Sequence, residues 1–85
     1  MIANIKKRAK QYPGSYELGV SGRIKVNGKV VTFIAYTNPQ NSTGVCYVVY
    51  SVGGKEYSMT RDSLDIYDKE AVKLSVVANC EYRNI

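Results

Sequence analysis

The sequence contains no histidine and no tryptophan, and it has only two cysteines. With Cys46 and Cys80 as its only thiols, the chain cannot supply the four Cys and His ligands of a structural zinc site. A cysteine nucleophile would also lack the imidazole base that activates it. The sequence contains no recognisable catalytic motif. We therefore expect a protein that is not an enzyme and that uses no metal or other cofactor.

Acidic residues are almost absent from the N-terminal third of the chain, where Glu17 is the only one. Seven of the twelve basic residues lie in this third: Lys6, Lys7, Arg8, Lys10, Arg23, Lys25 and Lys29. Residues 1–29 therefore carry 7 − 1 = +6 and residues 30–85 carry 5 − 6 = −1, which together make the +5 of the chain. Positive charge concentrated in one region favours a polyanionic partner, nucleic acid first.

Long apolar runs are also missing. No run approaches the roughly 20 residues of a transmembrane helix, and the first residues lack the hydrophobic region of a signal peptide. We expect a cytoplasmic protein with no membrane partner. The 85 residues indicate a single domain, 1–85, which is small for both a core and an enclosed active site. A binding surface is therefore favoured over an enzyme cleft.

The N-terminal segment has the pattern of a short amphipathic helix. Its apolar residues recur at the spacing of one helical face: Ile2, Ile5, Ala9 and Tyr12. Pro13-Gly14 then ends the pattern. We expect a basic helix over residues 1–12, whose apolar stripe packs on the rest of the chain because so short a helix is marginal alone.

The period of the apolar residues then changes to two, which predicts a β domain over residues 16–82. In the first strand, the alternation from Tyr16 to Val26 places the apolar residues on one side. Gly19 and Gly22 interrupt this strand. Glycine within a strand is typical of a bulge or a strong bend, so we expect one here.

Two hairpins follow from the turn residues. Asn27-Gly28 predicts a two-residue turn, because both central residues of a type I′ turn need positive φ. This turn sets a register in which Gly22 lies opposite Phe33. After a turn-rich loop over 37–44, a second hairpin over 45–60 turns at Gly53-Gly54.

The central strands, 30–36 and 45–52, are apolar on both sides. Such strands are covered on both faces. We expect the N-terminal helix to cover one of these two faces.

Two interpretations remain for the C-terminal segment. Unbroken alternation from Val72 to Tyr82 favours a fifth strand, whereas a helical face through Ala71, Leu74 and Ala78 keeps a helix over 69–79 open.

A 3₁₀ turn is expected before the C-terminal segment. Asp62 lies in position to cap this turn. Asp62, Asp65 and Asp68 lack the glycine of a calcium loop, so capping explains them better than metal binding. Cys46 and Cys80 lie within apolar alternation and are expected as buried thiols, and the sequence leaves open whether they are bonded to each other.

The predicted order of elements resembles the small five-stranded barrels of the Sm-like and Src-homology-3-like class. The resemblance is one of topology, and it carries over no site residue. It implies a mainly β fold with minor α content: a short N-terminal helix, then a five-stranded, strongly bent antiparallel sheet or barrel with a 3₁₀ turn before the last strand. Sm-like proteins bind RNA as rings, so it also implies RNA and a homo-oligomer. The OB-fold fits less well, because its helix usually lies where this chain has a tight turn.

Tyrosine occurs eight times, and most tyrosines fall on predicted core faces. Tyr36 and Tyr47 fall instead on the face of Arg23 and Lys25. If this face is open, the two rings can stack on unpaired bases; if the helix covers it, they form a second small core.

The favoured function is therefore non-enzymatic binding of nucleic acid through an N-terminal basic patch. Single-stranded RNA is preferred over duplex DNA, because no recognition helix for the major groove is evident. The candidate binding residues are the seven clustered cations with two tyrosines: Lys6, Lys7, Arg8, Lys10, Arg23, Lys25, Lys29, Tyr36 and Tyr47.

The alternative is an accessory protein of the kind that phages and mobile elements encode. It would bind and inhibit a host protein or an RNA-bound enzyme, as a counter-defence inhibitor or adaptor does. Its surface would be the flat face with Tyr36, Tyr47 and Val49, or an exposed strand edge.

Overall fold

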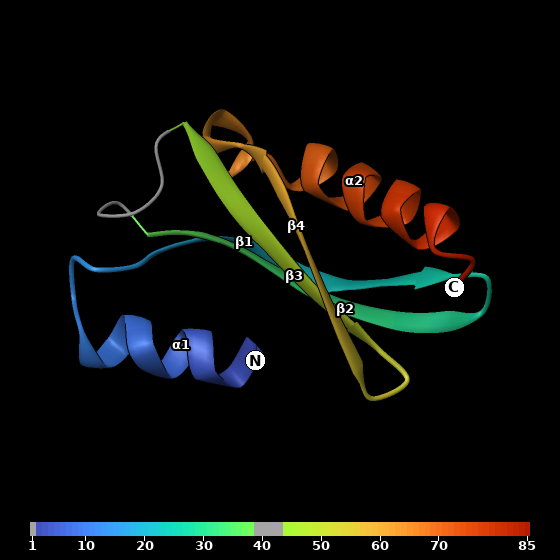
Figure 1. Ribbon diagram of the computed structural model, residues 1–85, viewed down its shortest axis with the longest axis horizontal. Helices are drawn as coiled ribbons and strands as arrows, with labels where there is room; N and C mark the ends of the chain where they lie inside the picture. The colour runs from blue at the N-terminus through green and yellow to red at the C-terminus, as the bar shows by residue number, and fades with distance from the viewer. Residues whose placement is uncertain (1, 39–43) are drawn as a thin grey trace.

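The computed structural model, which describes residues 2–38 and 44–85, has two helices on opposite faces of one antiparallel sheet (Figure 1). The elements follow the order α1 (Ile2–Gln11), β1 (Glu17–Val26), β2 (Lys29–Thr37), β3 (Val45–Val52), β4 (Lys55–Asp62), the 3₁₀ helix η1 (Ser63–Asp65) and α2 (Lys69–Tyr82). The strands pair in sequence order, so β1 and β4 are the edges of an open sheet. In the described part of the chain, no helix is long and apolar enough to cross a membrane.

The mainly β class and the N-terminal helix are confirmed, but the five-stranded barrel is not. The segment that alternation assigned to a fifth strand is the helix α2. Within residues 2–38 and 44–85 the sheet therefore has four strands, and its edges do not close on each other. Among the described residues, the expected first helix, the two hairpins and the 3₁₀ turn are present, and the fifth strand and barrel closure are not.

The even-numbered apolar residues explain why α2 resembled a strand. Val72, Val76 and Cys80 are four residues apart, so they satisfy a period of two and also lie on one helical face. All three are fully buried against the sheet. The helical alternative is therefore correct, but the buried face that it predicted is not, because Leu74 is 69% exposed. Asp68 caps the helix by accepting the Ala71 N–H at 3.1 Å.

The first hairpin has the predicted register. Gly22 lies opposite Phe33, and the turn residues Asn27 and Gly28 have φ values of 52° and 77°. The second hairpin turns at Gly53-Gly54 as expected. Residues 39–43 of the predicted loop lie outside the described residues.

The predicted bulge lies at Gly19 and Val20. Leu18 pairs with Tyr36 and Ser21 with Ile34, so two residues of β1 oppose one residue of β2. The extra residue reverses the alternation. Leu18 consequently packs on the α1 side of the sheet and Val20 on the α2 side. The expectation that both share one side with Tyr16 is wrong for this reason.

Each face of the sheet has its own core. The larger core lies under α2 and includes Phe33, Val48 and Tyr50. The smaller core lies under α1, where Ile5 packs with Ile34 and Val49. The expected cover of the second face is therefore present.

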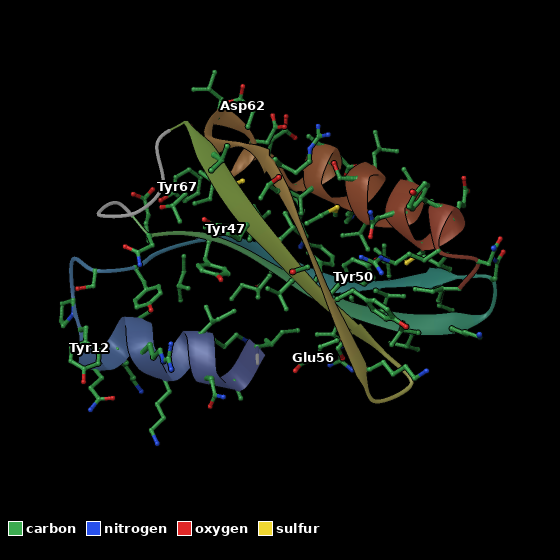
Figure 2. The ribbon with its side chains drawn as sticks, in the orientation of Figure 1. Tyr12, Tyr47, Tyr50, Glu56, Asp62 and Tyr67 are labelled. Atoms are coloured by element: carbon green, nitrogen blue, oxygen red, sulfur yellow. The ribbon has the colours of Figure 1, made fainter. Side chains whose placement is uncertain are left out.

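The cover provided by α1 is incomplete. Ile5 is the one residue of α1 that is fully buried, and the Ile2 N–H bonds to Oε2 of Glu56 on β4 at 3.2 Å. Tyr12 is 54% exposed at the end of the helix that lies away from the sheet (Figure 2). Val30, toward the far end of the first hairpin, is 51% exposed.

Candidate nucleic-acid interface

All seven predicted cations are exposed, and they divide among three places. Four lie on α1, which contains no acid: Lys6, Lys7, Arg8 and Lys10. Arg23 and Lys25 project from β1 on the side of α1, opposite Thr32 and Val30 of β2. Lys29 pairs with the buried Val26 and lines a hollow with Arg83 and Ile85. Lys29 therefore lies on the α2 side, apart from the other six cations.

A basic groove runs between α1 and β1. It consists of two adjoining hollows of about 550 and 340 Å³, which share Lys6 and Ser21. Lys10 lines one hollow and Arg23 the other. The residues that line both contain no acid. We call the surface formed by Lys6, Lys10, Arg23 and Ser21 the basic groove.

The remaining two cations of α1 lie outside the basic groove. Lys7 is two residues from the buried Ile5, about 200° around the helix, so it points away from the sheet. Arg8 lies on the opposite flank of α1 from Lys6 and lines a separate cleft. The helix thus presents cations on both flanks and on its outer side.

Three tyrosines form a row on the α1 side of the sheet. The rings of Tyr36 and Tyr47 have centroids 5.4 Å apart, and Tyr16 lies 6.2 Å from Tyr36. All three are half-buried, and Figure 2 shows Tyr47 on the face of β3 toward α1. The surface that they form, the tyrosine row, is neither fully open nor sealed by α1. Sequence analysis did not place Tyr16 on this face, because the bulge in β1 reverses the simple alternation and turns the start of the strand toward α1.

An aromatic cleft of about 310 Å³ lies between the tyrosine row and α1. Asn4, Ile5, Arg8, Tyr16 and Tyr36 line it. Burial raises the pKa of the Tyr36 hydroxyl, the neighbouring Tyr16 and Tyr47 raise it further, and the positive charge of Arg8 lowers it. Arg8 lines the same cleft as Tyr16 and Tyr36.

The C-terminal segment on the opposite side of the sheet is acidic. Residues 62–82, which include η1 and α2, contain two lysines and five acids and carry a net charge of −3. Lys29 and Arg83 on the same side offset part of this charge. The larger excess of positive charge therefore lies on the α1 side, which attracts a polyanion.

Two of the three predicted caps are present, at Asp62 and Asp68, whereas Asp65 forms an ion pair instead. Asp62 accepts the Leu64 N–H at 2.9 Å, and Asp65 pairs with Arg61 at 3.2 Å.

The two cysteines are buried and are not bonded to each other. Burial raises the pKa of both thiols, so neither has the thiolate character of a nucleophile at neutral pH. The Cys46 Sγ also donates to the Asp62 carbonyl oxygen at 3.4 Å. These contacts give both cysteines a packing role.

Comparisons with protein-family models, with curated proteins and with solved structures found no match to this chain. The function is therefore inferred from the site itself.

Proposed function

We propose that this protein binds single-stranded nucleic acid, RNA before DNA, without catalysing a reaction, and that it acts in the cytoplasm. The observation that carries the proposal is the basic groove. Lys6 and Lys10 of α1 and Arg23 of β1 line two adjoining hollows that no acid lines. Cations held along a groove follow a phosphate backbone and release its counterions.

The surroundings of the groove suit a single strand. Gly19, Ser21 and Gly22 line its β1 wall, and their small side chains let a backbone approach closely. The tyrosine row lies next to the groove and offers ring surface to unpaired bases. A duplex keeps its bases stacked inside, so it gains nothing from the tyrosines.

The proposal is tested by fluorescence anisotropy with a labelled 12-nucleotide RNA and with the same RNA in a duplex. We expect tighter binding of the single strand at low salt. The variant Lys6→Glu, Lys10→Glu should bind at least tenfold more weakly. The matched control Lys69→Glu, Lys73→Glu changes the net charge equally on the α2 side and should bind almost as the unaltered protein does. Equal losses in both variants would contradict a site beside α1.

A second candidate function, protein-binding adaptor or inhibitor, is favoured by the outer side of α2. Of the two surfaces that the sequence suggested, the face with Tyr36, Tyr47 and Val49 is partly covered, because Val49 packs under α1. Instead, Leu74 and Tyr82 are 69% and 85% exposed on the outer side of α2. Apolar side chains on an exposed helix face are typical of an interaction site. If this is the functional surface, Leu74→Glu with Tyr82→Glu abolishes co-purification of a host protein from nuclease-treated lysate, and the Lys6, Lys10 variant does not.

A further inference from the structure

The aromatic cleft contains groups that a phosphate-binding site does not need. Ile5, Tyr16 and Tyr36 line it with buried or half-buried side chains, and Asn4 and Arg8 line it with exposed ones. The volume of about 310 Å³ lies at the lower end of the range of small-ligand pockets. The cleft therefore suits one planar aromatic group of modest size that has a polar edge.

Asn4 and Arg8 are neighbours on one flank of α1. They are four residues apart, a spacing that places two side chains together on a helix surface. α1 is held in place by Ile5 on Ile34 and Val49, and by the bond between the Ile2 N–H and Glu56. Both polar side chains thus project from a docked element toward the same cleft.

The tyrosines allow stacking on one side only. Tyr16 and Tyr36 have centroids 6.2 Å apart at an interplanar angle of 45°, so the two rings contact each other and leave no parallel gap between them. A base that enters the cleft stacks on one ring and turns its edge toward α1. The groups that meet this edge are the guanidinium of Arg8 and the amide of Asn4.

We propose that the aromatic cleft binds one purine base of the strand, guanine in preference to adenine. Arg8 presents a planar fork of donors that matches the O6 and N7 acceptors of guanine. Pyrimidines lack this pair of acceptors and offer a smaller ring for stacking. The inference rests on the proposed function, since it concerns the same bound strand.

The cleft and the basic groove lie on opposite flanks of α1 and have one lining residue in common, Tyr16. This residue lines both the cleft and the hollow that contains Lys6 and Lys10. A strand that crosses the chain near Tyr16 places its phosphates in the groove and a base in the cleft. The groove would then supply affinity that is independent of sequence, and the cleft would discriminate among bases.

The experiment uses four labelled RNA hexamers that differ only in one central base, G, A, C or U, among flanking uridines. We expect the G hexamer to bind about tenfold more tightly than the all-U hexamer. Arg8→Lys keeps the charge and removes the planar fork. It should abolish the preference, so that the G hexamer binds no more tightly than the all-U hexamer. Arg8 is exposed, and an unchanged circular dichroism spectrum would confirm that the variant folds.

Lys7→Ala is the matched control, because it removes a cation of α1 outside the cleft. It should lower the affinity for all four hexamers by a similar factor and keep the preference for G. Equal binding of the four hexamers by the unaltered protein would overturn the purine site and leave the proposed function intact. A preference for A that Asn4→Ala removes would overturn the assignment to guanine. Failure of every hexamer to bind at low salt would overturn the proposed function itself.

Discussion

Gly19 approaches Ile66 so closely that a β-carbon on Gly19 would lie 2.1 Å from the Ile66 carbonyl oxygen. The backbone N–H of Val20 donates to the same oxygen at 2.9 Å. The bulge of β1 is thereby joined to the segment between η1 and α2. This contact occupies part of the β1 edge, which would otherwise be open to pairing with another strand.

Gly19→Ala should therefore destabilise the protein by more than about 2 kcal/mol, because a backbone atom must move to admit the methyl group. Gly22→Ala is the matched comparison. Its β-carbon would lie 3.3 Å from the Phe33 ring and 3.4 Å from the flexible side chain of Lys69, so we expect a loss below about 1 kcal/mol. Urea unfolding of both variants measures the difference. Equal losses would mean that the contact with Ile66 is not as close as described.

A second prediction separates binding from folding. Arg23→Glu with Lys25→Glu should reduce RNA affinity at least tenfold, because both cations lie on the face that borders the basic groove. The thermal midpoint should change little, since substitutions of exposed side chains usually stay within about 0.5 kcal/mol. Anisotropy and thermal unfolding are measured on the same samples. A large loss of stability with intact binding would show that these side chains act in packing.

The hairpins were predictable because local chemistry determines them. The Asn27-Gly28 turn sets the pairing of β1 with β2 without help from the rest of the chain. The Gly53-Gly54 turn does the same for β3 and β4. The N-terminal helix was equally predictable from its spacing and from Pro13-Gly14.

The C-terminal element and the tyrosine row depended on tertiary contacts. Val72, Val76 and Cys80 fit a strand and a helix equally well, and the sheet face that they bury against decides between the two. Tyr16 joins the row only because the bulge at Gly19 reverses the side of the strand. Lys29 is a different case, because its place on the α2 side follows from the predicted register, in which the Asn27-Gly28 turn pairs it with the buried Val26.

A third prediction concerns the attachment of α1. Ile5→Ala removes the largest contact of the helix with Ile34 and Val49, and a ten-residue helix is not stable alone. We expect the amides of α1 to exchange hydrogen much faster, with protection of β2 and β3 largely retained. The uncovered residues should also promote self-association. Hydrogen exchange followed by NMR tests this, and unchanged protection of α1 would contradict the assignment of Ile5 as its anchor.

A fourth prediction concerns alkaline pH. The Tyr50 hydroxyl donates to Oδ1 of Asn79, and burial, with a smaller effect of Cys80, raises its pKa above 10.0. The folded state favours the neutral Tyr50 hydroxyl. The contribution of this preference to the free energy of unfolding is therefore fully present below the pKa of an exposed tyrosine. It is lost as the pH rises through the raised value.

Tyr50→Phe should accordingly cost about 1 kcal/mol at neutral pH and weaken the decline of stability above about pH 10. The loss stays modest because Asn79 still accepts from Nε of Arg83 at 3.2 Å. Tyr82→Phe, at a residue 85% exposed, is the control and should leave the pH profile unchanged. Urea unfolding between pH 7 and 11 gives both profiles. Identical profiles for Tyr50→Phe and the unaltered protein would show that Tyr50 does not govern alkaline unfolding.

The salt dependence of RNA binding tests the central claim most directly. If Lys6, Lys10, Arg23 and their neighbours contact three to six phosphates, the logarithm of the association constant falls linearly with the logarithm of the salt concentration. At about −0.7 for each phosphate of a single strand, the slope lies between about −2 and −4. The account predicts a slope in this range for a 12-nucleotide RNA, and a shallower slope for Lys6→Glu, Lys10→Glu. No binding at low salt, or an affinity independent of salt, would contradict it.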